Sequence, residues 1–280
     1  MFMKMMKNNR VAVLQDISGL GRCSLAAALP VLSVMGAQCC PVPTAVFTNQ
    51  TGFSRFAVLD CGPLLKEFPV LWKAHGVELG GIYTGFMSSA GQLEAARDFI
   101  GAFRRPDTLL LADPVMGDGG ARYPCFDGAF CRAMREFAAR ADVLTPNVTE
   151  ACMLAGVEYH TLMGQDAAGQ LETLRLICEA LPPKRVVITG WRRGDKICNI
   201  AWDDGAFTVY ESPAVAGSWS GTGDLFASAL CGGLLRGDPL DTCVRRAMRF
   251  LEACLQSAAR LSLPKEEGVP FELYLKELMD

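Results

Sequence analysis

The sequence predicts an α/β fold with a mostly parallel sheet, and three observations carry this prediction. Short apolar runs alternate along the chain with helix-period segments of about a dozen residues. Glycine and polar residues follow most apolar runs, at the strand ends where ligands bind in parallel sheets. No flexible linker, low-complexity tract or fixed-period repeat interrupts the pattern. We therefore expect right-handed β-α-β units in a single domain covering residues 1–280.

Strands are predicted where the apolar runs are short. They are Val11–Leu14, Val42–Phe47, Gly81–Thr84, Thr108–Asp113, Asp142–Thr145, Arg185–Thr189, Ile197–Trp202 and Phe207–Tyr210. Pro41 and Pro43 bias the residues before them toward extended backbone. Asp203-Asp204-Gly205 has the composition of a hairpin turn, so the last two strands are expected to form an antiparallel edge.

Helices are predicted where apolar residues recur at helical spacing. They are Leu25–Met35, Pro63–His75, Gln92–Phe103, Phe130–Arg140, Glu150–Ala155, Ala167–Leu181, Thr222–Arg236 and Asp241–Leu261. Pro30 is expected to interrupt or kink the first of them. Phe271–Leu278 is a last amphipathic stretch.

Composition excludes several classes of protein. Half of the 280 residues are hydrophobic, which argues against intrinsic disorder. The net charge of -3 leaves no basic footprint for nucleic acid or an anionic membrane. Only four apolar residues follow the basic N-terminal stretch, and no apolar run approaches about 18 residues. We therefore expect neither a signal peptide nor a membrane span.

Cysteine usage indicates a reducing compartment. The chain holds 12 cysteines, none in a C-x-x-C pair, and most lie in apolar stretches. Buried reduced thiols in a cytoplasmic protein are the favoured interpretation, and a structural zinc site is disfavoured.

The strongest candidate segment is Gly217–Ala227, where a glycine-rich loop enters a predicted helix. Glycines let a backbone approach a ligand closely, and free N–H groups at a helix start bind anions. Asp224 would lie in the first helical turn, where the helix dipole should keep it ionised. It could then accept a proton from a substrate hydroxyl while nearby N–H groups hold a phosphoryl group. The alternative is that Asp224 only caps the helix.

Two further groups of polar residues follow predicted strands. Asp113 and Asp118 flank a Pro- and Gly-containing loop and could help to hold a hydrated magnesium ion, although both also suit ordinary turns. Asn147 and Glu150 are three residues apart at a helix start, so both could face one ligand. The alternative for this pair is an N-cap with an acid three residues later. All these groups are expected at one edge of one sheet.

Two common nucleotide motifs are missing from the sequence. It contains no G-x-x-x-x-G-K-[ST], and the first strand is not followed by G-x-G-x-x-G. A P-loop enzyme is therefore excluded, and a dinucleotide-binding dehydrogenase is disfavoured.

With these residues in view, the chain resembles the vitamin kinase branch of the ribokinase-like superfamily, from about Val11 to Leu261. This branch comprises pyridoxal/pyridoxamine kinases and hydroxymethylpyrimidine (phosphate) kinases. The matching segments are Gly221–Phe226, Asp113–Asp118, Thr145–Glu150 and Thr44–Thr51. Their order and spacing make the resemblance specific.

The resemblance implies a three-layer α/β/α sandwich and ATP-dependent phosphorylation of a hydroxymethyl group on a pyridine or pyrimidine ring. Asp224 would be the catalytic base, with Gly221 and Gly223 in the anion hole. Ser18, Thr44 and Phe86 would contact the substrate. The residues implied around ATP are Asp113, Asp118, Thr145, Asn147, Glu150, Thr189, Thr222 and Phe226, of which Asp113, Asp118 and Glu150 would be near magnesium. Such families often use potassium and form dimers, so a homodimer is expected.

Three departures from the pyridoxal kinase pattern concern the substrate pocket. Gln50 stands where histidine is common, and Phe86 stands where tyrosine is usual. Asp16-Ile17-Ser18-Gly19 looks more like the Asp-Pro-Ser-Gly of the pyrimidine kinases. We predict a pyridoxal/pyridoxamine 5′-phosphotransferase, with a hydroxymethylpyrimidine kinase as the first alternative. A sugar kinase of the wider superfamily is a weaker alternative, and a non-catalytic binding protein would be expected to lack Asp224.

Overall fold

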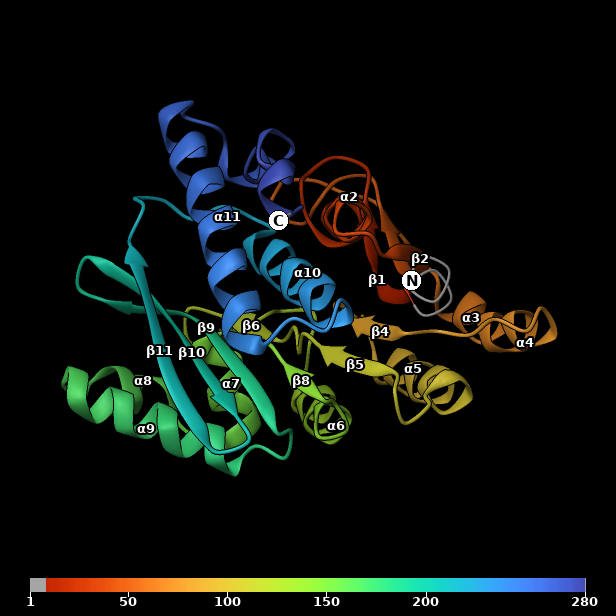
Figure 1. Cartoon of the computed structure of the whole chain (residues 1–280), viewed down its shortest axis with the longest axis horizontal. Helices are drawn as coiled ribbons and strands as arrows, with labels where there is room; N and C mark the ends of the chain where they lie inside the picture. The colour runs from red at the N-terminus through yellow and green to blue at the C-terminus, as the bar shows by residue number, and fades with distance from the viewer. Residues whose placement is uncertain (1–8, 280) are drawn as a thin grey trace. The chain divides into compact units, whose positions relative to one another are not determined.

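The computed structural model describes residues 9–279, which divide into two compact units (Figure 1). The first unit contains the described residues up to Leu110 and those from Val215 onward, and the second contains Leu111–Ala214. The chain leaves the first unit within strand β5 (Leu109–Ala112). The prediction of a single domain is not decided by this division and stays a prediction.

The first unit is built on strands in the order β4-β1-β2-β3. They are β1 (Arg10–Ser18), β2 (Gln38–Phe47), β3 (Val58–Asp60) and β4 (Gly81–Thr84). The strand β1 pairs in parallel with β2 and β4, whereas β3 runs antiparallel to β2. Val11, Ala12, Val13 and Leu14 of β1 have no exposed surface. This continuous apolar run is typical of a parallel strand covered on both faces.

Helices and turns complete the first unit. They are α2 (Ser24–Val34), α3 (Gly62–Leu65), α4 (Glu67–Ala74), α5 (Ala90–Phe103), α10 (Thr222–Leu235), α11 (Leu240–Arg260), and the 3-10 turns η1 (Lys265–Glu267), η2 (Phe271–Leu273) and η3 (Leu275–Leu278). The helix α10 packs against both α2 and α11 (Figure 1). It is therefore apolar on nearly every side, with buried residues from Leu225 to Gly233.

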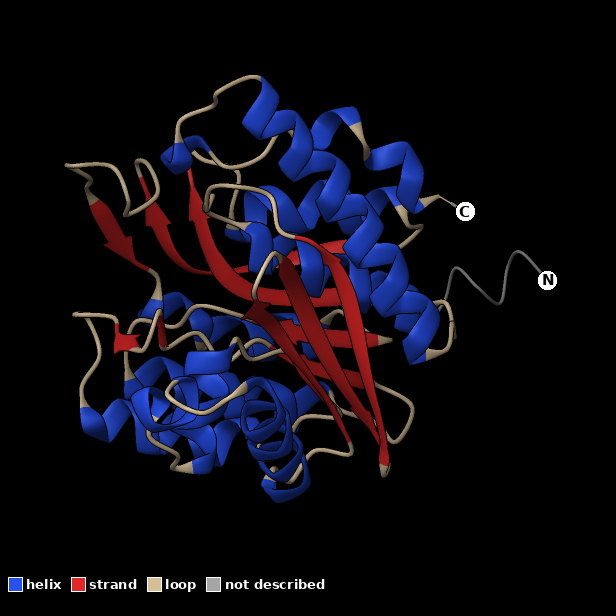
Figure 2. Ribbon diagram, turned by 90° about the vertical axis from the view of Figure 1, so that its left-hand side faces the viewer, coloured by secondary structure: helices blue, strands red, loops and turns tan. Residues whose placement is uncertain are grey.

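The second unit has strands in the order β5-β8-β9-β10-β11. They include β8 (Val143–Leu144), β9 (Arg185–Arg193), β10 (Lys196–Asp203) and β11 (Ala206–Pro213). The first three strands pair in parallel, and the last three pair antiparallel. Its helices are α6 (Gly128–Ala138), α7 (Val148–Ala155), α8 (Tyr159–Met163) and α9 (Ala167–Ala180), and a separate hairpin joins β6 (Gly117–Asp118) to β7 (Ala121–Arg122). Figure 2 distinguishes the helices of the chain from its strands by colour.

The predicted α/β class is confirmed, and every predicted strand has a counterpart. The predicted hairpin at Asp203-Asp204-Gly205 joins β10 to β11. The helix α2 runs through Pro30 without interruption. The predicted helix Pro63–His75 is instead two helices, because Pro69 lacks an N–H and lies in the first turn of a new helix. Phe271–Leu278 forms 3-10 turns rather than one amphipathic helix.

Five elements were missed by the sequence analysis: β3, β6, β7, α8 and the 3-10 turn η1. The strands β6 and β7 have two residues each, and β3 has three exposed residues. Segments this short show no periodicity, so nothing in the pattern separates them from turns.

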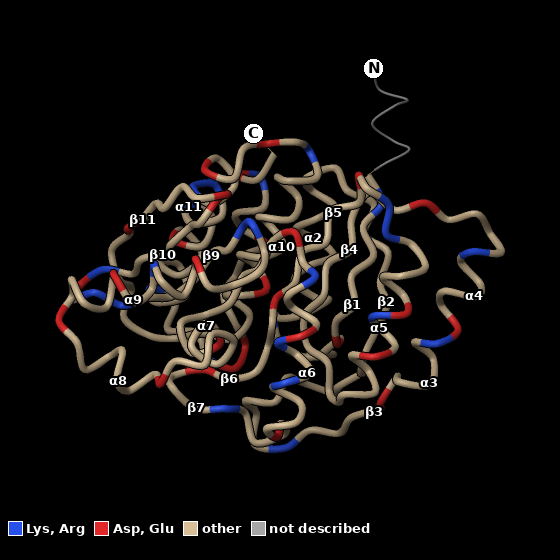
Figure 3. Tube along the Cα trace, turned by 90° about the horizontal axis from the view of Figure 1, so that it is seen from below, with Lys and Arg blue, Asp and Glu red and all other residues tan. Residues whose placement is uncertain are grey.

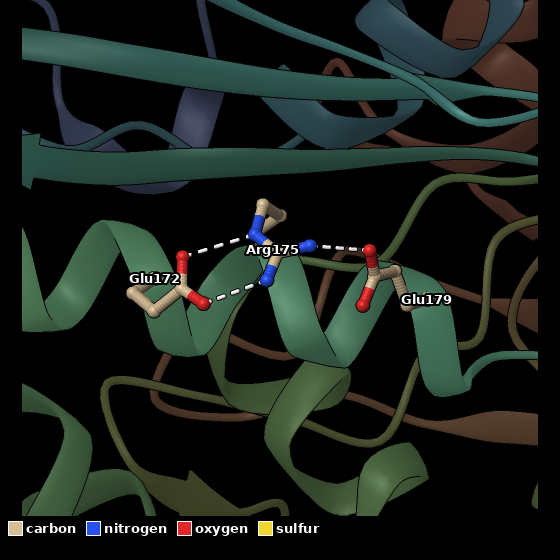
Figure 4. Close-up of polar contacts among 3 residues, drawn as sticks. All are labelled: Glu172, Arg175 and Glu179. Atoms are coloured by element: carbon tan, nitrogen blue, oxygen red, sulfur yellow. Dashed lines mark hydrogen bonds and ion pairs between the residues drawn. The ribbon is translucent and has the colours of Figure 1, made fainter.

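The surface carries mixed charge. Figure 3 shows Lys and Arg residues interspersed with Asp and Glu along the trace. On α9, Arg175 lies between Glu172 and Glu179 and pairs with both (Figure 4). Exposed ion pairs of this kind contribute little to stability, so they mark a solvated helix face.

Two expectations from composition can be compared with the described residues. None of their helices combines the length and apolar character needed to span a bilayer. All 12 cysteines are free, and eight of them are buried: Cys23, Cys61, Cys152, Cys178, Cys198, Cys231, Cys243 and Cys254.

Candidate active site

The candidate residues fall into two groups, one in each unit. We call Gln15, Asp16, Ser24 and Asp224 of the first unit the base cluster. We call Asp118, Asn147, Thr149, Glu150 and Thr189 of the second unit the cap cluster. The expectation that all candidates share one sheet edge concerns the two units together and stays a prediction.

Asp224, the predicted base, is placed by the start of α10. Gly221 is the N-cap residue, with φ of 80° in the left-handed region that favours glycine. A Cβ at Gly221 would lie 1.9 Å from the carbonyl oxygen of Arg22, so a side chain is excluded there. At Gly223, by contrast, a Cβ would meet no atom within 4 Å. The predicted glycine loop at a helix start is confirmed, and Gly221 is needed for the turn itself.

The side chain of Asp224 does not cap its helix. The amide Nε2 of Gln15 donates a hydrogen bond to Asp224 Oδ1, and the backbone N–H of Ser24 donates to the same carboxylate. Both donors lie outside α10, which argues against the capping alternative. The carboxylate is thus held by β1 and by the start of α2.

The protonation of Asp224 differs from the expectation. Asp224 as a whole residue is partly exposed, but its carboxyl group is enclosed by protein. The resulting desolvation raises the pKa of this carboxyl group to about 7. The neighbouring charge of Asp16 also raises the pKa, whereas the hydrogen bonds from Ser24 and Gln15 lower it. At pH 7 the carboxyl group is therefore only partly ionised, whereas the helix dipole was expected to keep it ionised. A carboxyl group with a pKa near 7 is suited to accept a proton at neutral pH.

Ser24 joins the two acids of the base cluster. Its backbone N–H bonds to Asp224, while its side chain and that of Ser18 hydrogen-bond to Asp16. Ser24 has φ of 50°, a conformation uncommon for a residue other than glycine. Burial raises the pKa of Asp16, and burial beside the two carboxylates raises the pKa of the Cys23 thiol to about 12. Cys23 is therefore a neutral thiol rather than a nucleophile.

Two of the predicted substrate residues are in contact. The Thr44 hydroxyl is fully buried and donates to the backbone carbonyl of Phe86 at 2.8 Å. The amide Nε2 of Gln92 donates to the carbonyl of Thr44 at 2.8 Å, which fixes this segment from α5. Ser18 bonds to Asp16, as described above. Contact of these side chains with substrate stays a prediction.

Gln50, which stands where histidine is common, links the loop after β2 to the η1 turn by hydrogen bonds. Its Nε2 donates to the carbonyl of Glu266 at 2.9 Å, and its Oε1 accepts from the N–H of Gly52 at 2.8 Å. A neutral imidazole also offers one donor and one acceptor. The departure at Gln50 therefore keeps the hydrogen-bonding capacity that histidine would have.

The η1 turn fastens three loops of the first unit. Its successive carbonyls at Lys265, Glu266 and Glu267 accept hydrogen bonds from Ser220 N, Gln50 Nε2 and Arg22 N. We call this arrangement the η1 clasp. The loops are those that follow β1 and β2 and the glycine loop before α10. Sequence reasoning missed the clasp because backbone carbonyls carry no residue signature.

The cap cluster is organised by the start of α7. Asn147 Oδ1 accepts from the N–H of Glu150, and Glu150 Oε2 accepts from the N–H of Asn147, each at 2.9 Å. This is a capping box, so the N-cap alternative for the pair is confirmed. Glu150 Oε1 also accepts from Met116 N at 3.0 Å, and Asn147 Nδ2 donates to Gly117 O at 2.8 Å. The box therefore also holds the loop that follows β5.

The loop from Asp113 to Asp118 ends in the β6–β7 hairpin. Gly119 and Gly120 have φ of 59° and 82°, as a primed two-residue turn requires. Asp118 Oδ1 accepts from Gly119 N at 2.8 Å, and Gly120 N donates to Thr149 Oγ1 at 2.9 Å. The turn-forming alternative for Asp118 is thus confirmed.

Thr145, Asn147 and Thr189 lie where β8 and β9 run side by side. The N–H of Thr145 donates to the carbonyl of Ala112 at 3.1 Å, and Thr189 N donates to Pro146 O at 2.9 Å. Asn147 and Thr189 form a parallel bridge. The structure therefore brings these three predicted residues to one edge of the second unit.

The predicted magnesium ligands Asp113, Asp118 and Glu150 fit a metal ion only in part. Burial raises the pKa of Glu150 to about 8, although backbone N–H groups of Asn147, Met116 and Gly117 act in the opposite direction. Both carboxylate oxygens of Glu150 already accept backbone hydrogen bonds. Across residues 9–279, no three His, Cys, Asp or Glu side chains are grouped so that they could hold a metal ion. Asp113, Asp118 and Glu150 thus do not form a protein-only cage, and metal ligation by them stays a prediction.

Comparison with known proteins places this geometry in a family. The family model described as phosphomethylpyrimidine kinase matches residues 23–269, a span that includes both clusters apart from Gln15 and Asp16. The chain belongs to the phosphomethylpyrimidine kinase family. This membership confirms the predicted vitamin kinase branch of the ribokinase-like superfamily.

Individual proteins of known name or structure match nearly the whole chain. The pyridoxal kinase PdxY of Rubrobacter xylanophilus is 30% identical over 263 residues, covering 88% of this chain and 87% of its own. A candidate phosphomethylpyrimidine kinase of Bacteroides thetaiotaomicron is 35% identical, with a TM-score of 0.91 and coverage of 97% and 94%. A second crystal form of that protein contains pyridoxal and has a TM-score of 0.87. The pyridoxal kinase of Lactobacillus plantarum is 28% identical, with a TM-score of 0.87 and coverage of 97% and 96%.

Proposed function

We propose that this chain is an ATP-dependent pyridoxal kinase that phosphorylates the 5′-hydroxymethyl group of pyridoxal, pyridoxamine and pyridoxine. The observation that carries the proposal is the placement of Asp224: a carboxylate with a pKa of about 7, next to exposed Gly223 in the first turn of α10. The choice of a B6 vitamer is supported by the relatives named as pyridoxal kinases and by the 35% identical protein solved with pyridoxal.

In the proposed reaction, Asp224 accepts the proton of the substrate hydroxyl. The alcohol oxygen forms a bond to the γ-phosphorus of ATP, and the bond from that phosphorus to the bridging oxygen breaks, which releases ADP. Backbone N–H groups at Gly221 and Gly223 are assigned to the transferring phosphoryl oxygens. Because phosphoryl transfer proceeds through a loose transition state, positioning and charge neutralisation suffice, and histidine is not required.

The second unit is assigned to the nucleotide. Asp113, Asp118, Thr145, Asn147, Glu150 and Thr189 are proposed around the phosphates, together with Thr222 and Phe226 of α10. Magnesium would neutralise phosphate charge, and it keeps several waters and takes few protein ligands. Asp118, which is exposed, is the better candidate for such a contact than Glu150, whose oxygens are occupied. A potassium requirement, a homodimer and a cytoplasmic location belong to the same proposal.

The alternative substrate is a hydroxymethylpyrimidine. It is favoured by one observation, the Asp16-Ile17-Ser18-Gly19 segment, in which Ser18 bonds to buried Asp16. The chemistry at Asp224 would be the same and only the ring would differ.

A side-by-side turnover assay tests the proposal. Purified protein is given ATP and magnesium with pyridoxal, pyridoxamine, pyridoxine or hydroxymethylpyrimidine, and the 5′-phosphate products are measured by mass spectrometry. We expect the B6 vitamers to be phosphorylated with a higher kcat/KM than the pyrimidine. A higher kcat/KM for the pyrimidine would make hydroxymethylpyrimidine the substrate in place of the B6 vitamers. The absence of product from all four compounds would refute the proposed kinase activity.

A further inference from the structure

Gln15 has an unusual position for a buried polar residue. It follows the apolar run of β1, its side chain has no exposed surface, and its Nε2 donates to Asp224 Oδ1. The register of β1 against β2 shifts between Gln15 and Ile17. Such irregularities are common beside active sites, where they aim a side chain.

Room for the Gln15 amide is provided by Gly85. A Cβ at Gly85 would lie 2.5 Å from Gln15 Nε2 and 2.8 Å from its Cδ. Any larger residue at position 85 would displace the amide from Asp224. The sequence thus places a glycine where this side chain needs space, directly after Thr84 of β4.

The position is unfavourable for stability alone. The Oε1 atom of Gln15 is buried and has no hydrogen-bond partner among the described residues. An unsatisfied buried acceptor destabilises the folded state, and an apolar side chain of the same volume would remove the defect. An unsatisfied polar side chain at this buried position therefore indicates a role for Gln15 other than packing.

We propose that Gln15 is the positioning residue of the base, because its amide holds the Asp224 carboxylate in place in its ionised form. This inference rests on the proposed function. The bond is charge-assisted, since an ionised carboxylate accepts it from the amide, and it becomes a weaker neutral hydrogen bond when Asp224 is protonated. Gln15 thereby opposes the desolvation that burial imposes on the base.

The groups that face Asp224 define what removal of Gln15 would do. From β1, Asp16 raises the pKa of Asp224, and from the start of α2 the backbone N–H of Ser24 lowers it. Cys23, the other titratable neighbour, is a neutral thiol at these pH values. Gln15 is the side-chain donor among these groups, and its hydrogen bond lowers the pKa. Without it, the pKa of Asp224 should move above about 7.

The experiment compares wild type with Gln15→Met, which keeps the volume and removes the donor. We expect the acidic limb of kcat/KM against pH to move up by about one pH unit, the usual scale for a charge-assisted hydrogen bond. At pH 7 this is a loss of about fivefold, recovered near pH 9. Below about pH 6, where Asp224 is protonated in both proteins, the Tm should be unchanged or higher, because the unsatisfied oxygen has been removed.

A second variant reaches the same contact from the other side. Gly85→Ala should displace the amide and move the limb in the same direction. Gly101→Ala in α5, where a Cβ meets nothing within 4 Å, is the matched control and should leave the limb in place. A merely structural role for Gln15 predicts a lower Tm with an unmoved limb, and that result would overturn the inference.

The role of Gln15 can also be tested without enzymatic turnover, which distinguishes its failure from failure of the proposed function. If wild type phosphorylates no B6 vitamer or pyrimidine, the titration of the Asp224 carboxyl is followed by ¹³C NMR, with Asp224→Asn identifying its signal. The titration midpoint should still be about one pH unit higher in Gln15→Met. Equal midpoints in the two proteins would refute the role of Gln15, whatever the substrate is.

Discussion

Asp224 and Glu150 occupy the same position in two different helices. Each is the third residue after the N-cap, Asp224 in α10 and Glu150 in α7, and burial raises the pKa of each. They differ in what precedes them. Asn147 has a side chain that completes a capping box with Glu150, whereas Gly221 has none, so Asp224 is not drawn into a cap.

We expect this difference to separate a structural carboxyl group, that of Glu150, from one that is available to a substrate, that of Asp224. Glu150 accepts from Asn147 and Met116 and thus holds a loop to a helix. Asp224 accepts from Gln15 and from Ser24 N, beside a glycine where a Cβ meets no atom. An acid at a helix start is therefore available for chemistry when the N-cap residue offers it no partner.

The largest effect is expected at Asp224. Asp224→Asn keeps the size and one acceptor but cannot take a proton, so kcat should fall by about 10²-fold or more, as is usual for loss of a general base. ATP affinity, measured by calorimetry, should change little. An active Asp224→Asn enzyme would remove the distinction between the two acids.

Glu150 should show the opposite behaviour. Glu150→Ala leaves the N–H groups of Asn147 and Met116 without their acceptor, at a cost of about 1–3 kcal/mol for a buried group. The Tm should therefore fall by about 2–4 °C per kcal/mol, as judged by calorimetry.

Magnesium dependence gives the control for Glu150. Glu150→Gln keeps one acceptor, so its Tm should fall less than that of Glu150→Ala. Its magnesium requirement should match wild type if Glu150 is structural. A raised magnesium requirement at unchanged Tm would instead return Glu150 to the metal site.

The pH dependence of stability gives a third contrast. The folded-state pKa of Asp224, about 7, lies above the value of an unfolded chain, about 4. Ionisation therefore destabilises the folded protein, and the stability present below pH 4 is lost as pH rises toward 7. Asp224→Asn should exceed wild type in Tm by about 2 °C or more at pH 8.

The direction in which this Tm difference changes with pH tests the titration of Asp224. The advantage of Asp224→Asn in Tm should shrink as pH is lowered and vanish near pH 4, where wild-type Asp224 is protonated. Activity of wild type should change in the other direction, rising through pH 7. A Tm gap that stays constant with pH would mean that Asp224 does not titrate as described.

The smallest effect is expected at Gln50. Gln50→His still offers one donor and one acceptor, so the bonds to Glu266 O and Gly52 N can persist. The Tm should therefore stay within about 2 °C of wild type. Gln50→Leu, the matched variant without either group, should lower the Tm further. Equal losses in both variants would argue against a hydrogen-bonding role.

Much of this could be predicted from the sequence, and the reasons differ by residue. Alternating apolar runs are enough to indicate the α/β class, and Gly221-Thr222-Gly223-Asp224 marks a helix start with an acid in its first turn. The pattern Asn147-x-x-Glu150 is itself a capping-box signature. These features are local, so the spacing of residues along the chain is sufficient to find them.

What could not be predicted depends on residues distant in the chain. The protonation of Asp224 follows from its enclosure, which includes β1 and the start of α2. Gln15 is separated from Asp224 by 209 positions, and its only signal is a polar residue directly after an apolar strand. The η1 clasp uses carbonyl groups that every residue has. Desolvation and long-range contacts of this kind leave no pattern in a linear sequence.

The η1 clasp has a consequence for how the protein is made. Glu266 follows Gln50 by 216 positions, so the loop after β2 must wait for its partner until most of the chain has left the ribosome. Contacts of such high sequence separation form late and slow the overall search. A nascent chain that has not yet reached Glu266 therefore lacks the hydrogen bond that holds the loop after β2.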